Sequence, residues 1–249
     1  MRKHRILAAC WLAAASLAAA DSPAAPAAGD RLMTESGPLF IHPVNHATLV
    51  MTWNNRAIYV DPVGSAAAFK EFPPADLILV AHGHGDHYSA STIDAVRRTN
   101  TVLVAPPSVR GAMPESQRTL TIWLGNGEGT NVLGLRIEAI PACNLTSSFH
   151  PKGAGNGYVL TLGGRRLYIS GDTEDIPEMR RLRDIDVAFL CMNLPYTMSV
   201  DKAASATREF KPSVVYPYHF RSRDGTMADL ESFKSKVGDG IEVRVRKWY

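Results

Sequence analysis

The sequence lacks an apolar run long enough for a membrane-spanning helix. Its longest apolar stretch, ILAACWLAAASLAAA, covers residues 6–20, whereas a span needs about 18 or more apolar residues. The stretch follows the basic start MRKHR and ends in Ala18-Ala19-Ala20, which is the pattern of a cleavable signal peptide. We therefore predict a signal peptide at residues 1–20, a mature chain that begins at Asp21 without a stable membrane span, and a periplasmic or secreted location.

Two other interpretations of this segment stay open. It could be retained as a membrane anchor, or it could be a lipoprotein signal, because LAAC at Leu7–Cys10 resembles a lipobox. A lipoprotein signal would leave only a few apolar residues ahead of Cys10.

Cysteine is scarce as well. The chain has three cysteines, and Cys10 would be lost with the signal peptide. The remaining two, Cys143 and Cys191, can pair in an exported protein. Two unpaired thiols, or thiols that bind a metal, are the alternatives.

The sequence also has little excess charge. Lys and Arg number 27 against 24 acidic residues, and residues 1–20 hold Arg2, Lys3 and Arg5 but no acid. Without them the chain has 24 basic and 24 acidic residues. This balance gives no indication of a nucleic-acid or acidic-membrane partner, so we expect a small-molecule ligand.

Composition divides the remaining chain into a linker and one domain. Residues 21–37, DSPAAPAAGDRLMTESG, are rich in Ala, Pro, Ser and Gly and are typical of a flexible linker. From Pro38 to Tyr249 no comparable break and no internal repeat occurs, which predicts a single domain over residues 38–249.

Strand-like and helix-like segments alternate along this domain. Apolar strand patterns are turned at Asn54-Asn55 and at Gly163-Gly164, and a helix is expected from Ser89 or Ser91 to about Arg98. Further strands are expected at DLILVA, TVLVAP, TLTIWL, LRIEAIPA, DIDVAFLCM, SVVYPYHF and IEVRVR, and further helices at PEMRRLR, DKAASATREF and TMADLESFKSKV. Two β-rich halves, each with helices beside it, predict an α/β fold with four layers, an αββα sandwich.

The strand DLILVA leads directly into the densest cluster of ionisable residues. The pattern H-x-H-x-D-H in VAHGHGDHYSAS places three of the eight histidines within six residues, and chance would produce it in roughly one such sequence in two thousand. In a strand-to-helix loop His82 and His84 can share one ion, while Asp86 and His87 face a second position. Without a cation these groups would repel one another or lack partners.

Other donors would have to complete these sites from distant segments. Candidates are His150 in FHPKGAG, Asp172 in SGDT and His219 after the strand SVVYPYHF, because sites form where strand ends converge. For His42 and His46 we favour satisfied positions in the core.

The order of these motifs resembles that of the metallo-β-lactamase superfamily. HGHGDH at a strand end, then a lone His, then GDT, then a His closing a strand, covers Pro38 to His219. NHATLVM, PACN, FHPKGAGNGYVL and YPYHF are similar to segments of a metal-dependent hydrolase branch that includes ascorbate-6-phosphate lactonase-like proteins. The resemblance implies the metallo-β-lactamase fold.

The resemblance also implies roles for individual residues. His82, His84 and His150 would bind a first metal, Asp86, His87 and His219 would bind a second, and Asp172 would bridge the two. His46 and Asp61 would support these ligands from behind. Asn193, Tyr196 and Thr197 in MNLPYTM would contact substrate unless they form an ordinary loop, and Lys152 would meet an anionic substrate unless it is simply solvated.

Such a centre predicts hydrolysis. Two divalent cations about 3.5 to 4 Å apart lower the pKa of a shared water, and the resulting hydroxide attacks a carbonyl or phosphoryl centre. Asp86 and Asp172 would be the catalytic carboxylates, and zinc is the default metal, with manganese or iron as alternatives. We expect cleavage of an ester, lactone or amide-type bond. A phosphodiesterase and a metal-binding protein without turnover are the alternatives.

Overall fold

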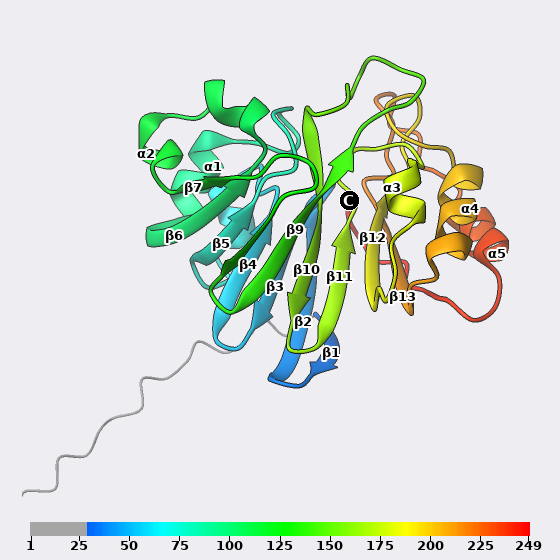
Figure 1. The fold of residues 1–249 in the computed structure, drawn as a ribbon, viewed down its shortest axis with the longest axis horizontal. Coiled ribbons are helices and arrows are strands. Elements are labelled where there is room, and N and C mark those ends of the chain that lie inside the picture. The colour runs from blue at the N-terminus through cyan, green and yellow to red at the C-terminus, as the bar shows by residue number, and fades with distance from the viewer. Residues whose placement is uncertain (1–28) are drawn as a thin grey trace, which may run out of the picture.

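Two seven-stranded mixed sheets make up the centre of the molecule (Figure 1). The structure, a computed structural model, describes residues 29–249. The predicted signal peptide, the proposed start at Asp21 and the lipobox cysteine Cys10 therefore lie outside the described residues. No described helix is both long enough and apolar enough to cross a membrane.

The two sheets have the same plan. In the first, the pairing is antiparallel from β1 to β4 and parallel from β4 to β7. In the second it is antiparallel from β8 to β11 and parallel from β11 to β14. The first sheet consists of β1 (Asp30–Thr34), β2 (Gly37–Asn45), β3 (Thr48–Trp53), β4 (Arg56–Val60), β5 (Ala75–Leu79), β6 (Arg97–Ala105) and β7 (Thr121–Trp123). The second consists of β8 (Gly129–Val132), β9 (Leu135–Ala142), β10 (Gly155–Leu162), β11 (Arg165–Ile169), β12 (Val187–Cys191), β13 (Val214–Tyr218) and β14 (Glu242–Val243).

Both predicted hairpin turns are confirmed. Asn54 and Asn55 join β3 to β4 with φ of 48° and 57°, and Gly163 and Gly164 join β10 to β11 with φ of 48° and 75°. Two residues of positive φ match the twist of the flanking strands. Asn and Gly adopt this conformation at low cost, so the local sequence determines where each chain reversal lies.

The main hydrophobic core lies between the sheets, as alternation along the strands requires. On β3, Leu49 and Met51 point into this core, whereas Val50 belongs to a second cluster on the outer face. That outer cluster includes Ile93 and Val96 of helix α1. A strand whose two faces are both covered must be apolar throughout, which explains the continuous apolar runs in the sequence.

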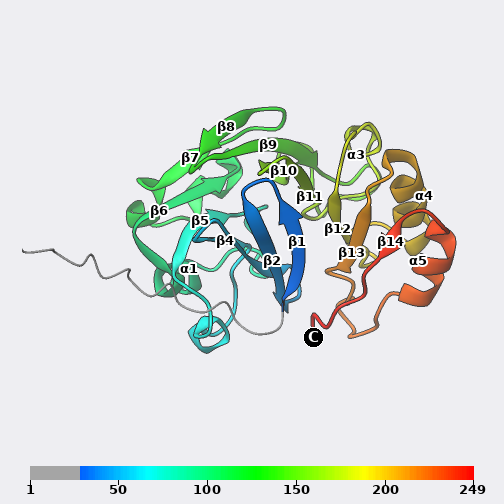
Figure 2. The same ribbon diagram turned by 90° about the horizontal axis from the view of Figure 1, so that it is seen from below.

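Helices cover both outer faces and complete four layers (Figures 1 and 2). Helices α1 (Ala90–Val96) and α2 (Glu115–Arg118) lie beside the first sheet, and α3 (Pro177–Arg180), α4 (Val200–Phe210) and α5 (Leu230–Val237) lie beside the second. Short 3-10 turns, η1 (Ala66–Phe69) and η2 (Pro107–Gly111), complete the first half. The predicted αββα sandwich is confirmed, and Ser89 is the N-cap of α1, where its side chain accepts a hydrogen bond from the Thr92 amide.

The boundary of the predicted linker was wrong. Strand β1 (Asp30–Thr34) lies inside the segment 21–37 and pairs with β2 along its whole length. It is an edge strand in which partly buried and exposed residues alternate, so its composition differs little from that of a linker. The hydroxyl of Tyr216 and the guanidinium of Arg246 both bind the Asp30 carboxylate, at 2.7 and 2.8 Å, and attach this strand to the second sheet.

The two cysteines of the described chain do not form a disulfide. Cys143 and Cys191 are both free and buried, and neither belongs to a group of described side chains that could hold a metal ion. They pack in the apolar core between the sheets, where a thiol behaves as a small hydrophobic side chain. Of the three expectations for these residues, two unpaired thiols is the one that the structure supports.

Candidate metal centre

The candidate ligands lie where parallel strands of both sheets end. Because parallel strands present their carboxyl ends at the same edge, the residues that follow them come together. Asp61 follows β4, the HGHGDH loop follows β5, Asp172 follows β11 and His219 follows β13. The parallel halves of the two sheets therefore both contribute donors.

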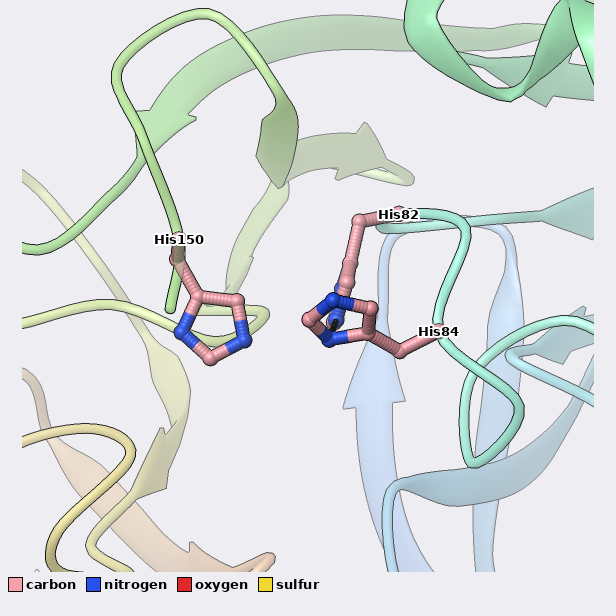
Figure 3. Close-up of side chains that lie close together, drawn as sticks. All are labelled: His82, His84 and His150. Carbon is pink, nitrogen blue, oxygen red and sulfur yellow. Dashed lines mark hydrogen bonds between the residues drawn. The ribbon is translucent and has the colours of Figure 1, made fainter. Parts of the chain in front are cut away.

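One group of donors consists of three histidines (Figure 3). His82 and His84 come from the loop after β5, and His150 reaches them from the loop between β9 and β10. The Nε2 atom of His82 lies 3.0 Å from Nδ1 of His84, and ligand atoms of all three lie within 4.8 Å of one another. His150 directs Nδ1 at the carbonyl oxygen of Tyr196, 3.1 Å away. A carbonyl only accepts hydrogen bonds, so Nδ1 carries the proton and Nε2 keeps its lone pair.

A second group lies beside the first. The Nε2 atoms of His87 and His219 are 3.1 Å apart, and Oδ2 of Asp86 lies 3.3 Å from Nε2 of His219. His87 is fully buried and directs Nδ1 at Oδ2 of Asp61, 2.7 Å away. This contact keeps the proton on Nδ1 and leaves Nε2 available as a ligand, the arrangement in which a carboxylate orients a metal-binding histidine.

Asp172 stands between the two groups. Its Oδ1 lies 3.3 Å from Nε2 of His87 and 3.3 Å from Nε2 of His219. Its Oδ2 lies 3.3 Å from Nε2 of His150. One carboxylate therefore faces both groups of histidines, one oxygen toward each.

These donors fit divalent cations. The Nε2 of His150 and the Oδ1 of Asp172 are buried and form no hydrogen bond with any described residue, which is costly unless something else binds them. Ligands about 2.0 to 2.1 Å from a tetrahedral ion lie about 3.3 Å from one another. The shortest donor separations around the two groups, 3.0 to 3.3 Å, are close to that spacing.

His46 also approaches this cluster, and its hydrogen bonds indicate which ring nitrogen carries the proton. The Tyr249 hydroxyl accepts hydrogen bonds from the amides of Phe220 and Arg221 at 3.2 and 3.1 Å. Both of its lone pairs are thereby used, so its proton is donated to Nδ1 of His46, 2.8 Å away. Burial lowers the pKa of His46, and the neutral ring therefore carries its proton on Nε2. That N–H lies 3.3 Å from Oδ2 of Asp86 and can donate to it. His46, Asp86 and His219 also form one of the groups whose ligand atoms lie close enough together to hold a metal ion.

Three residues of this region adopt left-handed backbone conformations, which are uncommon for any residue other than glycine. The φ angles of His46, Asp61 and His219 are 53°, 45° and 46°, and each such residue costs about 1 kcal/mol or more. Gly171, just before Asp172, has φ of 60°, and a Cβ there would lie 2.8 Å from the Asn156 carbonyl oxygen. Backbone strain therefore occurs at residues that place side chains in or beside the cluster.

The two carboxylates that face the cluster are charged at neutral pH. Burial alone would raise the pKa of Asp172, but the charges of His219 and His87 hold it well below its ordinary value. Burial also acts upward on the pKa of Asp86, yet hydrogen bonds from His219 and His46 lower it far below the usual range. Both carboxylates are therefore available to a cation.

The histidines divide into two kinds. Burial lowers the pKa of His82 and of His150, so both rings are neutral near pH 7. Burial would lower the pKa of His87 too, but the carboxylates of Asp172 and Asp61 raise it well above the ordinary value. A cation must displace a proton from His87, which links metal binding to pH.

Comparison with known proteins agrees with this geometry. The profile of the beta-lactamase superfamily domain matches residues 41–219. A UPF0173 metal-dependent hydrolase from Thermococcus onnurineus is 34% identical over 213 residues, which cover 82% of this chain and 94% of the relative. The chain belongs to the β-lactamase superfamily, among the UPF0173 metal-dependent hydrolases.

Solved structures share the fold of this chain. A protein from Parabacteroides distasonis, provisionally assigned as a metal-dependent hydrolase, is 42% identical, with a TM-score of 0.77 over 88% of this chain and 98% of its own. A metallo hydrolase from Ignicoccus hospitalis has a TM-score of 0.71 over 83% of this chain and 94% of its own, at 24% identity. At that identity the likeness concerns the fold alone.

Two cavities adjoin the cluster in this superfamily member. One, of about 190 Å³, is lined by His84, Asp86, Phe149, His150, Asp172, Asn193 and Tyr196. The other, of about 340 Å³, is lined by His46, Asp86, Asn193, Tyr196, Arg221, Ser222 and Arg223. Asn193 and Tyr196, the predicted substrate contacts, line both. Thr197 is buried and donates a 2.6 Å hydrogen bond to Oδ1 of Asn193, so it positions that amide.

The structure brings together all seven residues that the sequence assigned to metal, and it places His46 and Asp61 directly behind them. His42 is buried beside Phe72, but its Nε2 forms no hydrogen bond with any described residue, so the predicted satisfied core position was only half right. Lys152 is exposed. Phe149, Arg221, Arg223 and Tyr249 were not predicted to belong to this site. The only available signal was the basic pair RSR directly after YPYHF, and nothing in the sequence connects Tyr249 to His46.

Proposed function

We propose that this protein is an exported dinuclear hydrolase that cleaves an ester, lactone or amide-type bond. The proposal rests mainly on the position of Asp172. A carboxylate with one oxygen toward each histidine group is suited to bridge two cations, because its negative charge offsets their mutual repulsion. Two bound divalent cations would supply a shared water of lowered pKa and positive charge for a developing oxyanion.

The donor set favours zinc. It would be held by His82, His84 and His150 on one side and by Asp86, His87 and His219 on the other, with Asp172 between. Histidine nitrogen is a preferred ligand of zinc, and manganese or iron also suits a site with a bridging carboxylate.

Asp86 is the residue that we assign to the nucleophile. Its carboxylate is charged, one of its oxygens lies 3.3 Å from the His46 Nε2 donor, and its side chain lines both cavities. A carboxylate fixed in this way can accept a hydrogen bond from the attacking water and hold it in line with the substrate carbonyl.

The cavity walls provide contacts for a carbonyl substrate. Because Oδ1 of Asn193 accepts from Thr197, its Nδ2 group remains as a donor toward a substrate oxygen. The rings of Phe149 and Tyr196 meet edge to face with centroids 4.8 Å apart and give the smaller cavity an apolar wall. Phe149 is 45% exposed, as expected for a side chain that gains a contact when substrate binds.

Metal content and turnover of matched variants test this function. We expect about two metal ions per wild-type chain, fewer in Asp172→Ala, and at least a hundredfold lower ester or lactone turnover in that variant. Asp201→Ala is the control, because Asp201 is an exposed residue of α4 paired with Lys236. A fully metallated and fully active Asp172→Ala variant would overturn the assignment.

A substrate panel separates the alternatives. The zinc-loaded protein is offered lactones, p-nitrophenyl esters and bis-p-nitrophenyl phosphate. Turnover of the phosphodiester alone would make the protein a phosphodiesterase. Tight metal binding without turnover of any compound would make it a metal-binding protein.

Export rests on the sequence of residues 1–20. Its test is the mass of the protein recovered from the periplasm or medium of an exporting host. We expect a chain that begins at or near Asp21, and an intact Met1 would contradict export by signal cleavage.

A further inference from the structure

Two arginines line the larger of the two cavities. Arg221 and Arg223 form part of its wall together with Ser222, and the cavity continues to Asp86, Asn193 and Tyr196. Those last three residues also line the smaller cavity. The larger cavity is therefore an extension of the candidate active site, and a molecule that reaches Asp86 can extend to the two guanidinium groups.

The Arg221 side chain is held in place. Its guanidinium lies 4.2 Å from the centroid of the Tyr249 ring, and its backbone amide donates to the Tyr249 hydroxyl at 3.1 Å. Stacking on an aromatic face leaves the N–H groups at the edge of the guanidinium plane free to bind a ligand. Arg221 also forms a β-bridge with Met227, which closes the loop that carries Arg223.

Neither arginine has an acidic partner among residues 29–249. By contrast, Arg244 and Arg246, on the segment that leads to Tyr249, pair with Glu242 and Asp30 at 2.6 and 2.8 Å. Asp224, the acid next to Arg223, instead accepts a hydrogen bond from the Thr226 amide at 2.9 Å.

The cavity lining therefore carries more positive than negative charge. Its one lining carboxylate, Asp86, already accepts from His46 and faces the metal ligands. Two guanidinium groups without a counter-charge create a positive potential that attracts anions, and cations bound at the proposed metal sites would add to it. Arginine is suited to carboxylate and phosphate because its N–H groups can bind two oxygens at once.

We infer that the substrate carries an oxyanion, a carboxylate or a phosphate group, that Arg221 and Arg223 bind while the scissile bond lies at Asp86. This inference rests on the proposed function and narrows its substrate class to anionic esters, lactones or amides. A neutral substrate would leave both guanidinium groups to water, because Arg221 and Arg223 are exposed.

Three esters of matched chain length provide the test. p-Nitrophenyl valerate is neutral, mono-p-nitrophenyl glutarate ends in a carboxylate, and p-nitrophenyl 4-phosphonobutyrate ends in a phosphonate. At low salt we expect kcat/KM of the zinc-loaded protein to favour the anionic esters by about tenfold or more. The larger of the two preferences identifies the oxyanion that the site takes.

Variants of the two arginines test whether these residues cause the preference for anionic esters. In Arg221→Met and in Arg223→Met we expect the anionic-to-neutral ratio of kcat/KM to fall about three- to tenfold, mainly through KM. Arg31→Met is the matched control, because Arg31 is an exposed arginine of β1 that has no ion pair within residues 29–249. A ratio near one in the wild type, or a ratio that neither cavity variant changes, would overturn the inference.

A binding measurement tests the oxyanion site independently of the proposed hydrolase activity. Glutarate is titrated into the protein while the arginine Nε–H resonances are followed by NMR, with the two variants providing the assignments. We expect the Arg221 and Arg223 resonances to shift and that of Arg31 to stay. If these shifts occur but no ester is cleaved, the proposed function fails and the oxyanion site stands. Cleavage of all three esters at equal kcat/KM, without any shift, retains the hydrolase and removes the site.

Discussion

Replacing Tyr249 with phenylalanine removes one oxygen and, with it, three hydrogen bonds. The hydroxyl accepts from the amides of Phe220 and Arg221 and donates to Nδ1 of His46 at 2.8 Å. The aromatic ring is retained, so the contacts with Phe220 and with the Arg221 guanidinium persist. The change therefore acts on His46 and through it on Asp86.

The size of the effect follows from these contacts. A hydrogen bond contributes about 0.5 to 1.5 kcal/mol net, and the Arg221 amide is exposed, so water can replace the hydroxyl there. We therefore expect a loss of about 1 kcal/mol in the free energy of unfolding. Without the hydroxyl the proton of His46 can move to Nδ1, and an unprotonated Nε2 then faces Oδ2 of Asp86 across 3.3 Å. Weaker support for Asp86 by about 1.4 kcal/mol would lower kcat about tenfold.

Three measurements on Tyr249→Phe separate this explanation from a general loss of structure. Imidazole ¹⁵N shifts report the tautomer of His46, elemental analysis reports metal content, and kinetics separate kcat from KM. We expect a mixed tautomer, unchanged metal content and a lower kcat with a similar KM. Loss of metal would contradict the expected metal content, and it is also the result expected if His46 binds metal directly, in the alternative group formed with Asp86 and His219. A wild-type kcat would refute the proposed support of Asp86.

Three further predictions concern metal binding and stability. Asp61→Asn removes the charge that orients His87, and we expect metal affinity, measured by chelator competition, to fall about 10- to 100-fold. Because the pKa of His87 is raised, protons compete with metal below that pKa. We therefore expect affinity in the same assay to be lower at pH 6 than at pH 8, and an affinity independent of pH would contradict this. Burial alone would raise the pKa of Asp30, but hydrogen bonds from Arg246 and Tyr216 lower it below the ordinary value. The ionised carboxylate therefore stabilises the folded protein above about pH 4, and this stabilisation is lost as the pH falls through the pKa of the folded state. In urea titrations Asp30→Asn should reduce stability by about 1 kcal/mol at pH 6 and by less at pH 3.

The elements that sequence predicted well are those with a local physical signal. The turns at Asn54-Asn55 and Gly163-Gly164 use residues that adopt positive φ cheaply, and β5 and β12 are continuous apolar runs covered on both faces. The HGHGDH loop places four polar groups too close together to be satisfied without a ligand. In each case the information lies within about a dozen neighbouring residues.

The parts that sequence did not predict depend on long-range contacts. Strand β1 buries little apolar surface, and the contacts of Asp30 with Tyr216 and Arg246 span 186 and 216 residues. Tyr249 and His46 are separated by 203 residues. The left-handed conformation of His219 could not be predicted locally either, because only a few per cent of non-glycine residues adopt it. Such features depend on how the two sheets pack together, and this packing cannot be deduced from any single segment of the sequence.

The division of the donors between the sheets has a consequence for the life of the protein in the cell. The HGHGDH loop belongs to the first sheet, whereas His150, Asp172 and His219 belong to the second. Cations bound as proposed would join the halves like a cross-link, and the free energy of unfolding would rise with the free metal concentration. Scarcity of metal would then reduce not only the activity of this protein but also its resistance to proteases, and so its abundance.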